Sequence, residues 1–225
     1  MNVIVFASRK GGTGKSTLAA HLAAYVHKPT RPCLLVDADP QGSLTLWHRL
    51  RESGEPPLKN GLRGITSILN AAERDGAEWV FVDTPPMMSA AVTDLIRAAT
   101  LVVIPARPGV FDLNAIKETI DVARRARRPF AVVLNACPPK RLDEESPMVA
   151  EARASLENLS VPVWSGQITN RATFSLSLAE GEGAKEYDAD SYAAGEIARV
   201  WTAIERSIRA IHGEYDGHAM HKKAA

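Results

Sequence analysis

The feature that most constrains this chain is a glycine-rich loop at residues 10–17 (Lys-Gly-Gly-Thr-Gly-Lys-Ser-Thr). It follows an apolar run at residues 3–7 and precedes a helical pattern at residues 18–24. Glycines permit backbone conformations that a Cβ would forbid, so successive N–H groups can point at one anion. The start of the next helix adds unpaired N–H groups and the positive end of its dipole. The sequence therefore predicts a buried strand, a phosphate-binding loop and a helix.

The loop departs from the common phosphate-loop pattern G-x-x-x-x-G-K-[ST]. Residues 9–16 fit that pattern only if its first glycine is replaced, because position 9 is Arg. Lys15 falls at the position that reaches the β- and γ-phosphates, and the Ser16 hydroxyl falls at the position that binds Mg²⁺. A second lysine, Lys10, stands five residues before Lys15. The residues expected to hold the nucleotide phosphates are Gly11, Gly12, Thr13, Gly14, Lys15, Ser16 and Thr17.

Further apolar runs alternate with helical patterns along the 225 residues. These runs lie at residues 33–36, 79–82, 101–104, 130–134 and 161–164. Short continuous runs of this kind predict an α/β fold with a doubly wound, mostly parallel sheet covered by helices on both faces. Functional groups should then gather at the carboxyl ends of the strands. We expect one domain over residues 1–212 and a polar, disordered tail over residues 213–225.

Composition narrows the class of protein. The net charge of +1 shows no excess of basic residues, so any affinity for nucleic acid needs a local patch. No apolar run approaches the roughly 20 residues of a membrane span, and the chain begins directly in a strand pattern without a basic leader. Cys33 and Cys137 fall in or beside strand patterns and are expected to be buried thiols. These features predict a cytoplasmic protein.

Polar residues follow the apolar runs where a parallel sheet would bring them together. Asp37 and Asp39 follow the run that ends at residue 36, Asp83 follows the run at residues 79–82, and Asn135 follows the run at residues 130–134. Asp83 is expected to bind Mg²⁺ through water. Asp39 lies where an Asp near the γ-phosphate would serve phosphoryl transfer. It also lies where it could cap a helix beginning near Gln41, and the two roles can coexist.

Four segments together resemble the ParA/MinD family of ATPases. Residues 10–17 resemble its deviant Walker A motif K-G-G-x-G-K-[ST], and residues 37–42 resemble its D-x-D-P-Q-G motif. Residues 105–112 are similar to a P-x-x-P-x-x-x-D segment, and residues 168–181 to I-x-x-R-x-x-[FY]-x-x-[AS]-x-x-x-G. The resemblance covers nearly the whole chain and is nearest to small ParA proteins that lack an N-terminal helix-turn-helix extension.

The resemblance implies roles for particular residues. Asp39 would orient the attacking water, Asp37 would support Mg²⁺ and the Ser16 shell, and Asn135 would hydrogen-bond the adenine edge. The residues implied to be catalytic are Lys10, Lys15 and Asp39, with ATP and Mg²⁺ as cofactors. Residues 105–112 would lie at or near a dimer interface, although a rigid proline loop explains them equally well.

Lys10 carries the most specific implication. In the family, the corresponding lysine crosses a two-fold interface to the nucleotide of the partner subunit, so ATP would hold a homodimer together and hydrolysis to ADP and phosphate would depend on dimerisation. The resemblance further implies non-specific DNA binding on the nucleoid. A ParB-like or cargo-adaptor protein would stimulate hydrolysis, and the cycle would segregate DNA or position a cargo.

The last predicted helix, residues 191–211, supplies a candidate DNA surface. Its apolar stripe, spaced i, i+3, i+4 and i+7, consists of Ile197, Val200, Trp201, Ile204, Ile208 and Ile211. Arg199, Arg206 and Arg209 project from the opposite side, where they could bind DNA phosphates without reading sequence. The alternative is a solvated face in which Glu196 and Glu205 dilute the charge.

Two further basic features are less specific. The resemblance makes Arg171 another candidate for DNA contact. The cluster at residues 124–128 ends a predicted helix, where cations complement the helix dipole, and it is also a second possible DNA patch.

Other functions on this fold are weaker readings. A MinD-like membrane-cycling ATPase needs a C-terminal amphipathic helix, but residues 213–221 are polar and broken by glycine, so no stable membrane association is expected. An electron-transfer protein of the iron-protein type needs cysteines at strand-end loops, whereas Cys33 begins a strand pattern. A tyrosine autokinase needs a tyrosine cluster in the tail, where Tyr215 stands alone.

Overall fold

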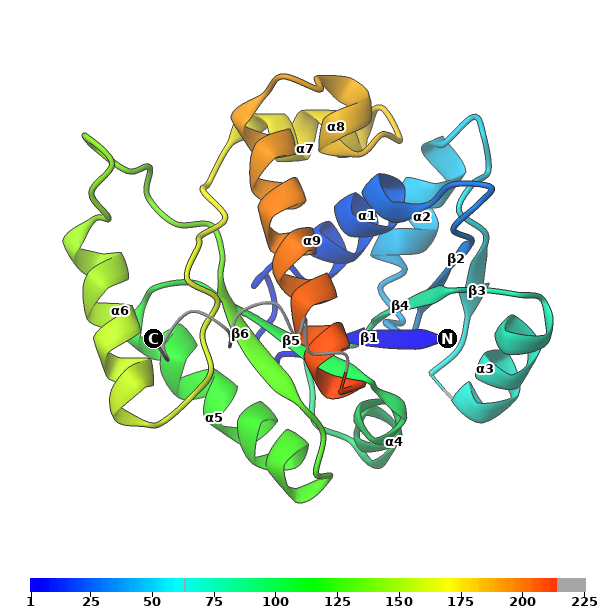
Figure 1. Cartoon of the computed structure of the whole chain (residues 1–225), viewed down its shortest axis with the longest axis horizontal. Helices are drawn as coiled ribbons and strands as arrows, with labels where there is room; N and C mark the ends of the chain where they lie inside the picture. The colour runs from blue at the N-terminus through cyan, green and yellow to red at the C-terminus, as the bar shows by residue number, and fades with distance from the viewer. Residues whose placement is uncertain (63, 214–225) are drawn as a thin grey trace, which may run out of the picture.

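The computed structural model describes residues 1–62 and 64–213 of the chain. Within them lies one six-stranded parallel sheet with the strand order β3-β2-β4-β1-β5-β6, shown in Figure 1. Its strands are β1 (Asn2–Phe6), β2 (Cys33–Asp37), β3 (Leu58–Asn60), β4 (Trp79–Asp83), β5 (Leu101–Ala106) and β6 (Phe130–Leu134). The central strands are buried on both faces, which is why they read as continuous apolar runs. The predicted α/β fold with a parallel sheet is confirmed.

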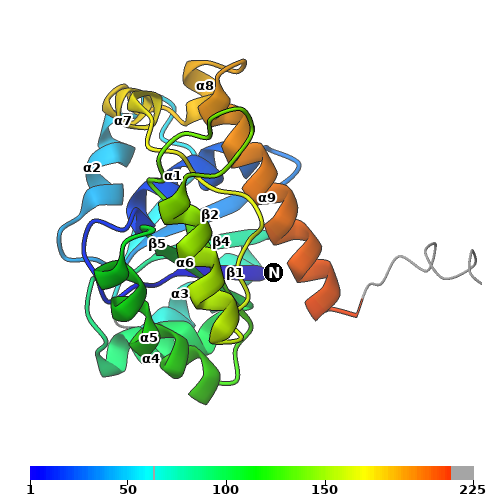
Figure 2. The same ribbon diagram turned by 90° about the vertical axis from the view of Figure 1, so that its left-hand side faces the viewer.

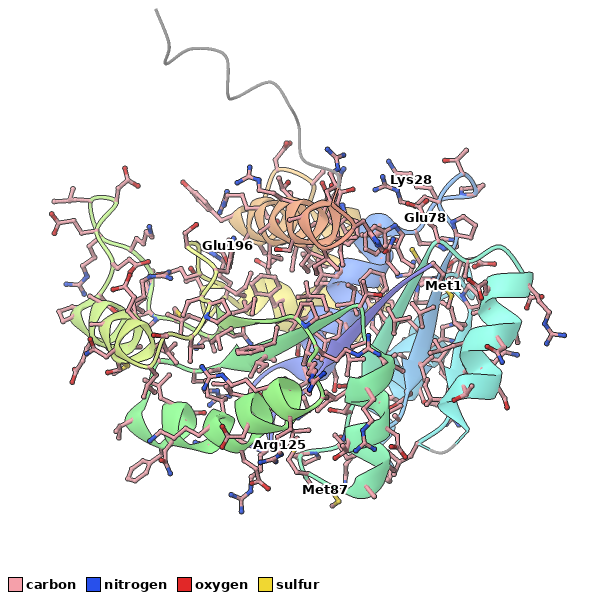
Figure 3. The ribbon with its side chains drawn as sticks, turned by 60° about the horizontal axis from the view of Figure 1, so that its bottom comes forward. Met1, Lys28, Glu78, Met87, Arg125 and Glu196 are labelled. Atoms are coloured by element: carbon pink, nitrogen blue, oxygen red, sulfur yellow. The ribbon has the colours of Figure 1, made fainter. Side chains whose placement is uncertain are left out.

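Helices cover both faces of the sheet. The described helices are α1 (Lys15–Val26), α2 (Ser43–Leu50), α3 (Ile65–Arg74), α4 (Ala90–Ala98), α5 (Val110–Arg125), α6 (Pro147–Asn158), α7 (Ala172–Ala179), α8 (Ala184–Tyr187) and α9 (Tyr192–Ile211). One core contains side chains of α3, α4, α5 and α6, and the other contains side chains of α1, α2, α7, α8 and α9. Figure 3 shows α9 and α5 on opposite sides of the sheet.

The sixth predicted strand, residues 161–164, is wrong as a strand of the sheet. This segment makes an isolated parallel bridge between Val163 and Val132, and the Trp164 N–H donates to the Val132 carbonyl over 2.9 Å. The segment also contains Pro162, which has no N–H to donate to a ladder. The chain therefore lies beside β6 without forming a regular strand.

β3 has no signal in the sequence pattern. It is three residues long, lies at the sheet edge and is largely exposed. Its register comes from pairing with β2, where Leu35 faces Leu58. An edge strand of this kind buries little apolar surface, so no apolar run is needed to form it.

α9 follows the prediction closely. It begins after Ser191, whose side chain accepts a hydrogen bond from the Ala194 N–H over 3.1 Å. Its predicted apolar stripe is buried except for Ile211, which is the last residue of the helix and is 38% exposed. Figure 2 shows α7 and α8 gathered beside the N-terminal end of α9.

Two further predictions concern the C-terminal tail and membrane-spanning segments. Residues 214–225 of the predicted disordered tail lie outside the described residues, so that prediction stays open. No helix within residues 1–62 and 64–213 is long and apolar enough to cross a membrane.

Candidate nucleotide-binding site

The glycine loop connects β1 to α1, and its backbone adopts a conformation that requires glycine at two positions. Gly12 and Gly14 have φ angles of 71° and 97°, in the left-handed region that glycine adopts without strain. Gly14 is the N-cap of α1 and offers no side-chain cap, so the first N–H groups of the helix are left for a ligand. A Cβ at Gly14 would lie 2.0 Å from the Asn135 Nδ2 atom. The local backbone is therefore that of an anion-binding loop.

Lys15 is buried at the start of α1. The residue is 6% exposed, and its Nζ donates a hydrogen bond to the Lys10 carbonyl over 3.4 Å. Burial lowers the pKa of the Lys15 ammonium, while the carboxylates of Asp83 and Asp39 raise it. Among the described residues Lys15 forms no ion pair within 4.0 Å. A buried cation of this kind is suited to an anionic ligand such as a phosphate.

Ser16 and Asp83 lie side by side at the ends of neighbouring elements. The Ser16 hydroxyl donates to Asp83 Oδ2 over 2.5 Å, and Asp83 is fully buried at the end of β4. Burial raises the pKa of Asp83 to about 7, against the lowering effects of the Ser16 hydrogen bond and the Lys15 charge. Its second oxygen, Oδ1, has no hydrogen-bond partner among the described residues. A buried carboxylate with an open oxygen beside a serine hydroxyl fits the hard oxygen ligands of Mg²⁺.

The described part of the chain contains no group of three or more His, Cys, Asp or Glu side chains placed to hold a metal ion. Magnesium characteristically keeps several waters and takes one or two protein ligands together with substrate phosphates. Ser16 and Asp83 therefore fit an ion that arrives with a nucleotide, and their binding of Mg²⁺ stays a prediction.

The structure shows Asp37, rather than Asp39, hydrogen-bonded to the first turn of α2. Asp37 Oδ2 accepts from the Thr45 N–H and hydroxyl over 2.8 and 2.7 Å, and Oδ1 accepts from the Asp39 N–H over 3.2 Å. Asp37 thus holds the first turn of α2, the capping role that was considered for Asp39. A role of Asp37 in supporting Mg²⁺ stays a prediction, because its two oxygens already have donors.

Asp39 faces a cleft beside the glycine loop. Its Oδ1 accepts from the Gln41 N–H over 3.0 Å, which fixes the turn before α2. The cleft has a volume of about 390 Å³ and is lined by Lys15, Ser16, Asp39, Trp47 and Leu178 among others. This size suits a small-molecule site. Trp47 and Leu178 were not predicted, because α2 and α7 meet here only through the fold.

Asn135 is placed behind the loop. It is 7% exposed, and its Nδ2 donates to the Thr13 carbonyl over 2.6 Å. It therefore ties the end of β6 to the phosphate loop, a contact that the sequence did not indicate. Its predicted hydrogen bond to adenine stays a prediction.

Lys10 contacts α5 of its own chain. Its Nζ lies 2.7 Å from Asp112 Oδ2, and the preceding Arg9 lies 3.0 Å from Glu118. Asp112 is part of the segment 105–112 that resembles the family's proline motif. The predicted reach of Lys10 to a partner subunit would require this ion pair to open.

The basic residues of α9 are exposed. Arg199, Arg206 and Arg209 lie at spacings of seven and three residues, which places them along one face of the helix. Glu196 does not dilute this row, because it is buried and accepts from the Arg171 guanidinium over 2.9 Å. Its position is labelled in Figure 3.

The charged residues near this arginine row form ion pairs with residues outside it. Glu205 pairs with Arg31 at 3.0 Å. Arg171 is held by Glu196 and lies 5.0 Å from the Tyr192 ring centre, so a DNA contact by Arg171 stays a prediction. In the second basic cluster, Arg124 donates to the Leu159 carbonyl over 3.4 Å.

The chain is similar in sequence to known nucleotide-binding proteins. A family model described as "CobQ/CobB/MinD/ParA nucleotide binding domain" matches residues 4–184. The "Maintenance of carboxysome distribution protein A" of Gloeobacter kilaueensis is 34% identical over 216 residues, covering 88% of this chain and 95% of the relative. "Protein ParA" of Rhizobium radiobacter is 39% identical over 118 residues, covering 50% of this chain and 51% of the relative.

Solved structures show the same fold. An ATP complex of a Cyanothece McdA variant has a TM-score of 0.68 at 17% identity, covering 95% of this chain and 96% of that chain. The Mg-ADP complex of the septum site-determining protein MinD from Pyrococcus horikoshii has a TM-score of 0.72 at 15% identity, covering 93% and 98%. At these identities the likeness concerns the fold alone.

Proposed function

The chain belongs to the CobQ/CobB/MinD/ParA nucleotide-binding family, and from this premise we propose that it is a Mg²⁺-dependent ATPase that positions a cargo on the nucleoid. ATP would favour a homodimer that binds DNA without sequence preference, and hydrolysis would release it. The observation that carries the ATPase proposal is the hydrogen bond from the half-buried Ser16 hydroxyl to the buried Asp83 carboxylate, beside Lys15 at the end of the glycine loop.

The residues of the site divide the work of phosphoryl transfer. The N–H groups at the start of α1 and the Lys15 ammonium would bind and neutralise the phosphates. Ser16 and Asp83 would hold Mg²⁺, which supplies charge stabilisation to the phosphate oxygens. Asp39, facing the cleft, would orient the attacking water. This reaction depends mainly on positioning and electrostatic stabilisation, which such an arrangement supplies.

Dimerisation would complete the site. Lys10 would leave Asp112 and approach the nucleotide of the partner subunit, so that a cation reaches the transferring phosphate only in the dimer. Turnover would then be slow in the monomer. A ParB-like or cargo-adaptor protein would stimulate hydrolysis in the dimer.

A protein cargo is favoured over a plasmid or chromosome by the comparisons. The relative that this chain covers to 95% of its length is named for carboxysome distribution, whereas the Rhizobium radiobacter ParA is covered to 51%. The row of Arg199, Arg206 and Arg209 supports the DNA-binding part of the proposal, because exposed arginines bind phosphates irrespective of sequence.

DNA binding in a salt series tests this proposal. We expect the protein to bind duplexes of unrelated sequence with a slowly hydrolysed ATP analogue and to lose binding with ADP. Replacing Arg199, Arg206 and Arg209 together by Ala should reduce the slope of log K against log salt by about 3, since each phosphate contact contributes about 0.9. Arg97→Ala is the matched control, because Arg97 is an exposed arginine paired with Asp94 on α4.

Two results would contradict the proposal. Binding that is equal with ADP and with the ATP analogue would refute nucleotide control. Binding to anionic lipid vesicles but not to DNA would replace this function by a membrane-cycling one.

A further inference from the structure

An arginine outside the predicted site lies against the phosphate loop. Arg107 follows β5, which pairs with β1 in parallel with Phe6 opposite Val103. The loops after these two strands therefore emerge side by side. The Arg107 Nη2 atom lies 3.8 Å from the position that a Cβ on Gly12 would occupy. Gly12 is one of the residues whose positive φ shapes the loop.

Arg107 forms no ion pair within the described residues, unlike Arg9 and Lys10 at the start of the loop. Arg9 and Lys10 are bound by Glu118 and Asp112 of α5, at 3.0 and 2.7 Å. Arg107 is exposed, and within residues 1–62 and 64–213 it has neither an ion pair nor a side-chain hydrogen bond. Within the described residues the Arg107 guanidinium is therefore unpaired, whereas the Lys10 ammonium is paired with Asp112.

We propose that Arg107 binds the terminal phosphate of the nucleotide, an inference that rests on the proposed ATPase function. A guanidinium presents a planar fork of N–H donors that matches phosphate oxygens and keeps its charge at any physiological pH. Because the Arg107 Nη2 atom lies close to Gly12, a change of side-chain rotamer would bring this fork to a phosphate held by the loop. The phosphate belongs either to the same subunit or to a second copy of the chain.

The residues that follow Arg107 indicate how the contact would be strengthened. Val110 and Phe111, in the first turn of α5, are 73% and 81% exposed. A second copy docked over them would exclude water from the rim of the loop. Charge-assisted hydrogen bonds become stronger when water is excluded. Arg107 would thus distinguish ATP from ADP, because only ATP carries the phosphate that it contacts.

The test compares three variants of the full chain with the unmodified protein. Arg107→Ala removes the guanidinium, Arg107→Lys keeps a charge without the fork, and Arg97→Ala is a control for loss of an exposed arginine. Dissociation constants for a slowly hydrolysed ATP analogue and for ADP, both with Mg²⁺, are measured below and above the protein concentration at which dimers form. Light scattering reports the oligomeric state.

We expect Arg107→Ala to weaken binding of the analogue about tenfold to a hundredfold and to leave ADP binding unchanged. Arg107→Lys should recover part of the loss. A loss in the monomer assigns the contact to the same subunit, and a loss confined to the dimer assigns it to the partner's nucleotide.

The inference is overturned if Arg107→Ala binds the analogue as tightly as Arg97→Ala does in both states. It is also overturned if ADP and the analogue lose affinity equally, since the terminal phosphate would then not be the contact. Failure of the unmodified protein to bind either nucleotide would instead refute the proposed function.

Discussion

Replacing Asp83 by Asn should stabilise the nucleotide-free protein at neutral and alkaline pH while removing the proposed Mg²⁺ site. Asp83 is fully buried and its Oδ1 has no partner among the described residues. Burial raises its pKa, the carboxylates of Asp37 and Asp39 raise it further, and Ser16 and Lys15 only partly oppose them. The ionised carboxylate is therefore unfavourable in the folded protein until a cation binds.

The magnitude follows from the pKa of Asp83, which is raised from 3.8 to about 7. Between these values the folded protein holds a proton that the unfolded chain releases, so the free energy of unfolding falls as the pH rises through this window. The difference corresponds to about 4 kcal/mol at pH 8, at about 1.4 kcal/mol per pH unit. This is an upper limit, because side-chain movement and water entry relieve part of the cost. Asn has the shape of the protonated carboxyl and carries no charge, so it avoids the cost of burying an ionised carboxylate.

Urea denaturation between pH 4 and pH 8, without nucleotide and with a chelator, measures the effect. The stability gained by Asp83→Asn should be near zero at pH 4 and should rise to about 2–4 kcal/mol at pH 8. Burial lowers the pKa of His21 to about 4, which gives the opposite pH trend between about 4 and its ordinary value of 6.5. That contribution is present in both proteins and cancels in the difference.

Asp94→Asn, an exposed residue on α4, is the control and should show no growing gain. An Asp83→Asn protein that is less stable than the unmodified one at pH 8, or a difference that does not change with pH, would refute the reasoning. The same variant should lose Mg²⁺-dependent ATP hydrolysis, measured by phosphate release.

Three further changes test the loop. Lys10→Ala should keep ATP binding but lower dimer-dependent turnover by about 10²–10³-fold, measured by phosphate release at several protein concentrations, and unchanged turnover would sink its proposed role. Gly11→Val should fold normally, because among the described residues a Cβ there would meet only Pro86, at 3.9 Å, yet stay monomeric with ATP in light scattering; a normal dimer would contradict this. Gly14→Ala should cost about 1–3 kcal/mol of stability and abolish nucleotide binding, since it combines a φ of 97° with a clash against Asn135; tight binding by this variant would be contrary evidence.

The sequence predicted those parts of the molecule whose signal is local. The strand β1, the glycine loop and the start of α1 are continuous in the chain, and their residue types are required by the backbone at those same positions. The positions of Asp83 and Asn135 beside the loop could be predicted because Asp83 ends β4, Asn135 follows β6, and a parallel sheet brings such ends together. The buried stripe of α9 followed from helical periodicity, with Ile211 as the exception.

The parts that were missed depend on contacts between distant segments. Residues 161–164 have the apolar content of a strand, but a strand also needs a partner along its length, and here the pairing is a single bridge. The hydrogen bond from the Thr45 N–H in the first turn of α2 to Asp37 joins this helix to the end of β2, and Asp39 instead accepts from the Gln41 N–H before the helix. Arg107 occupies an unspecified position of the proline segment at residues 105–112, and only the packing of β5 beside β1 brings it to Gly12.

The pairing of Lys10 with Asp112 is compatible with a role of Lys10 in a partner subunit. The Lys10 side chain is 39% exposed, so water can replace part of its contact as it leaves. Asp112 is more buried, at 11% side-chain exposure, and its departure from Lys10 would be costly if it were isolated. It lies, however, in the first turn of α5, where the helix dipole favours a negative charge. A nucleotide phosphate presented across an interface is a stronger partner for a lysine than one carboxylate, and would offset the loss of this ion pair.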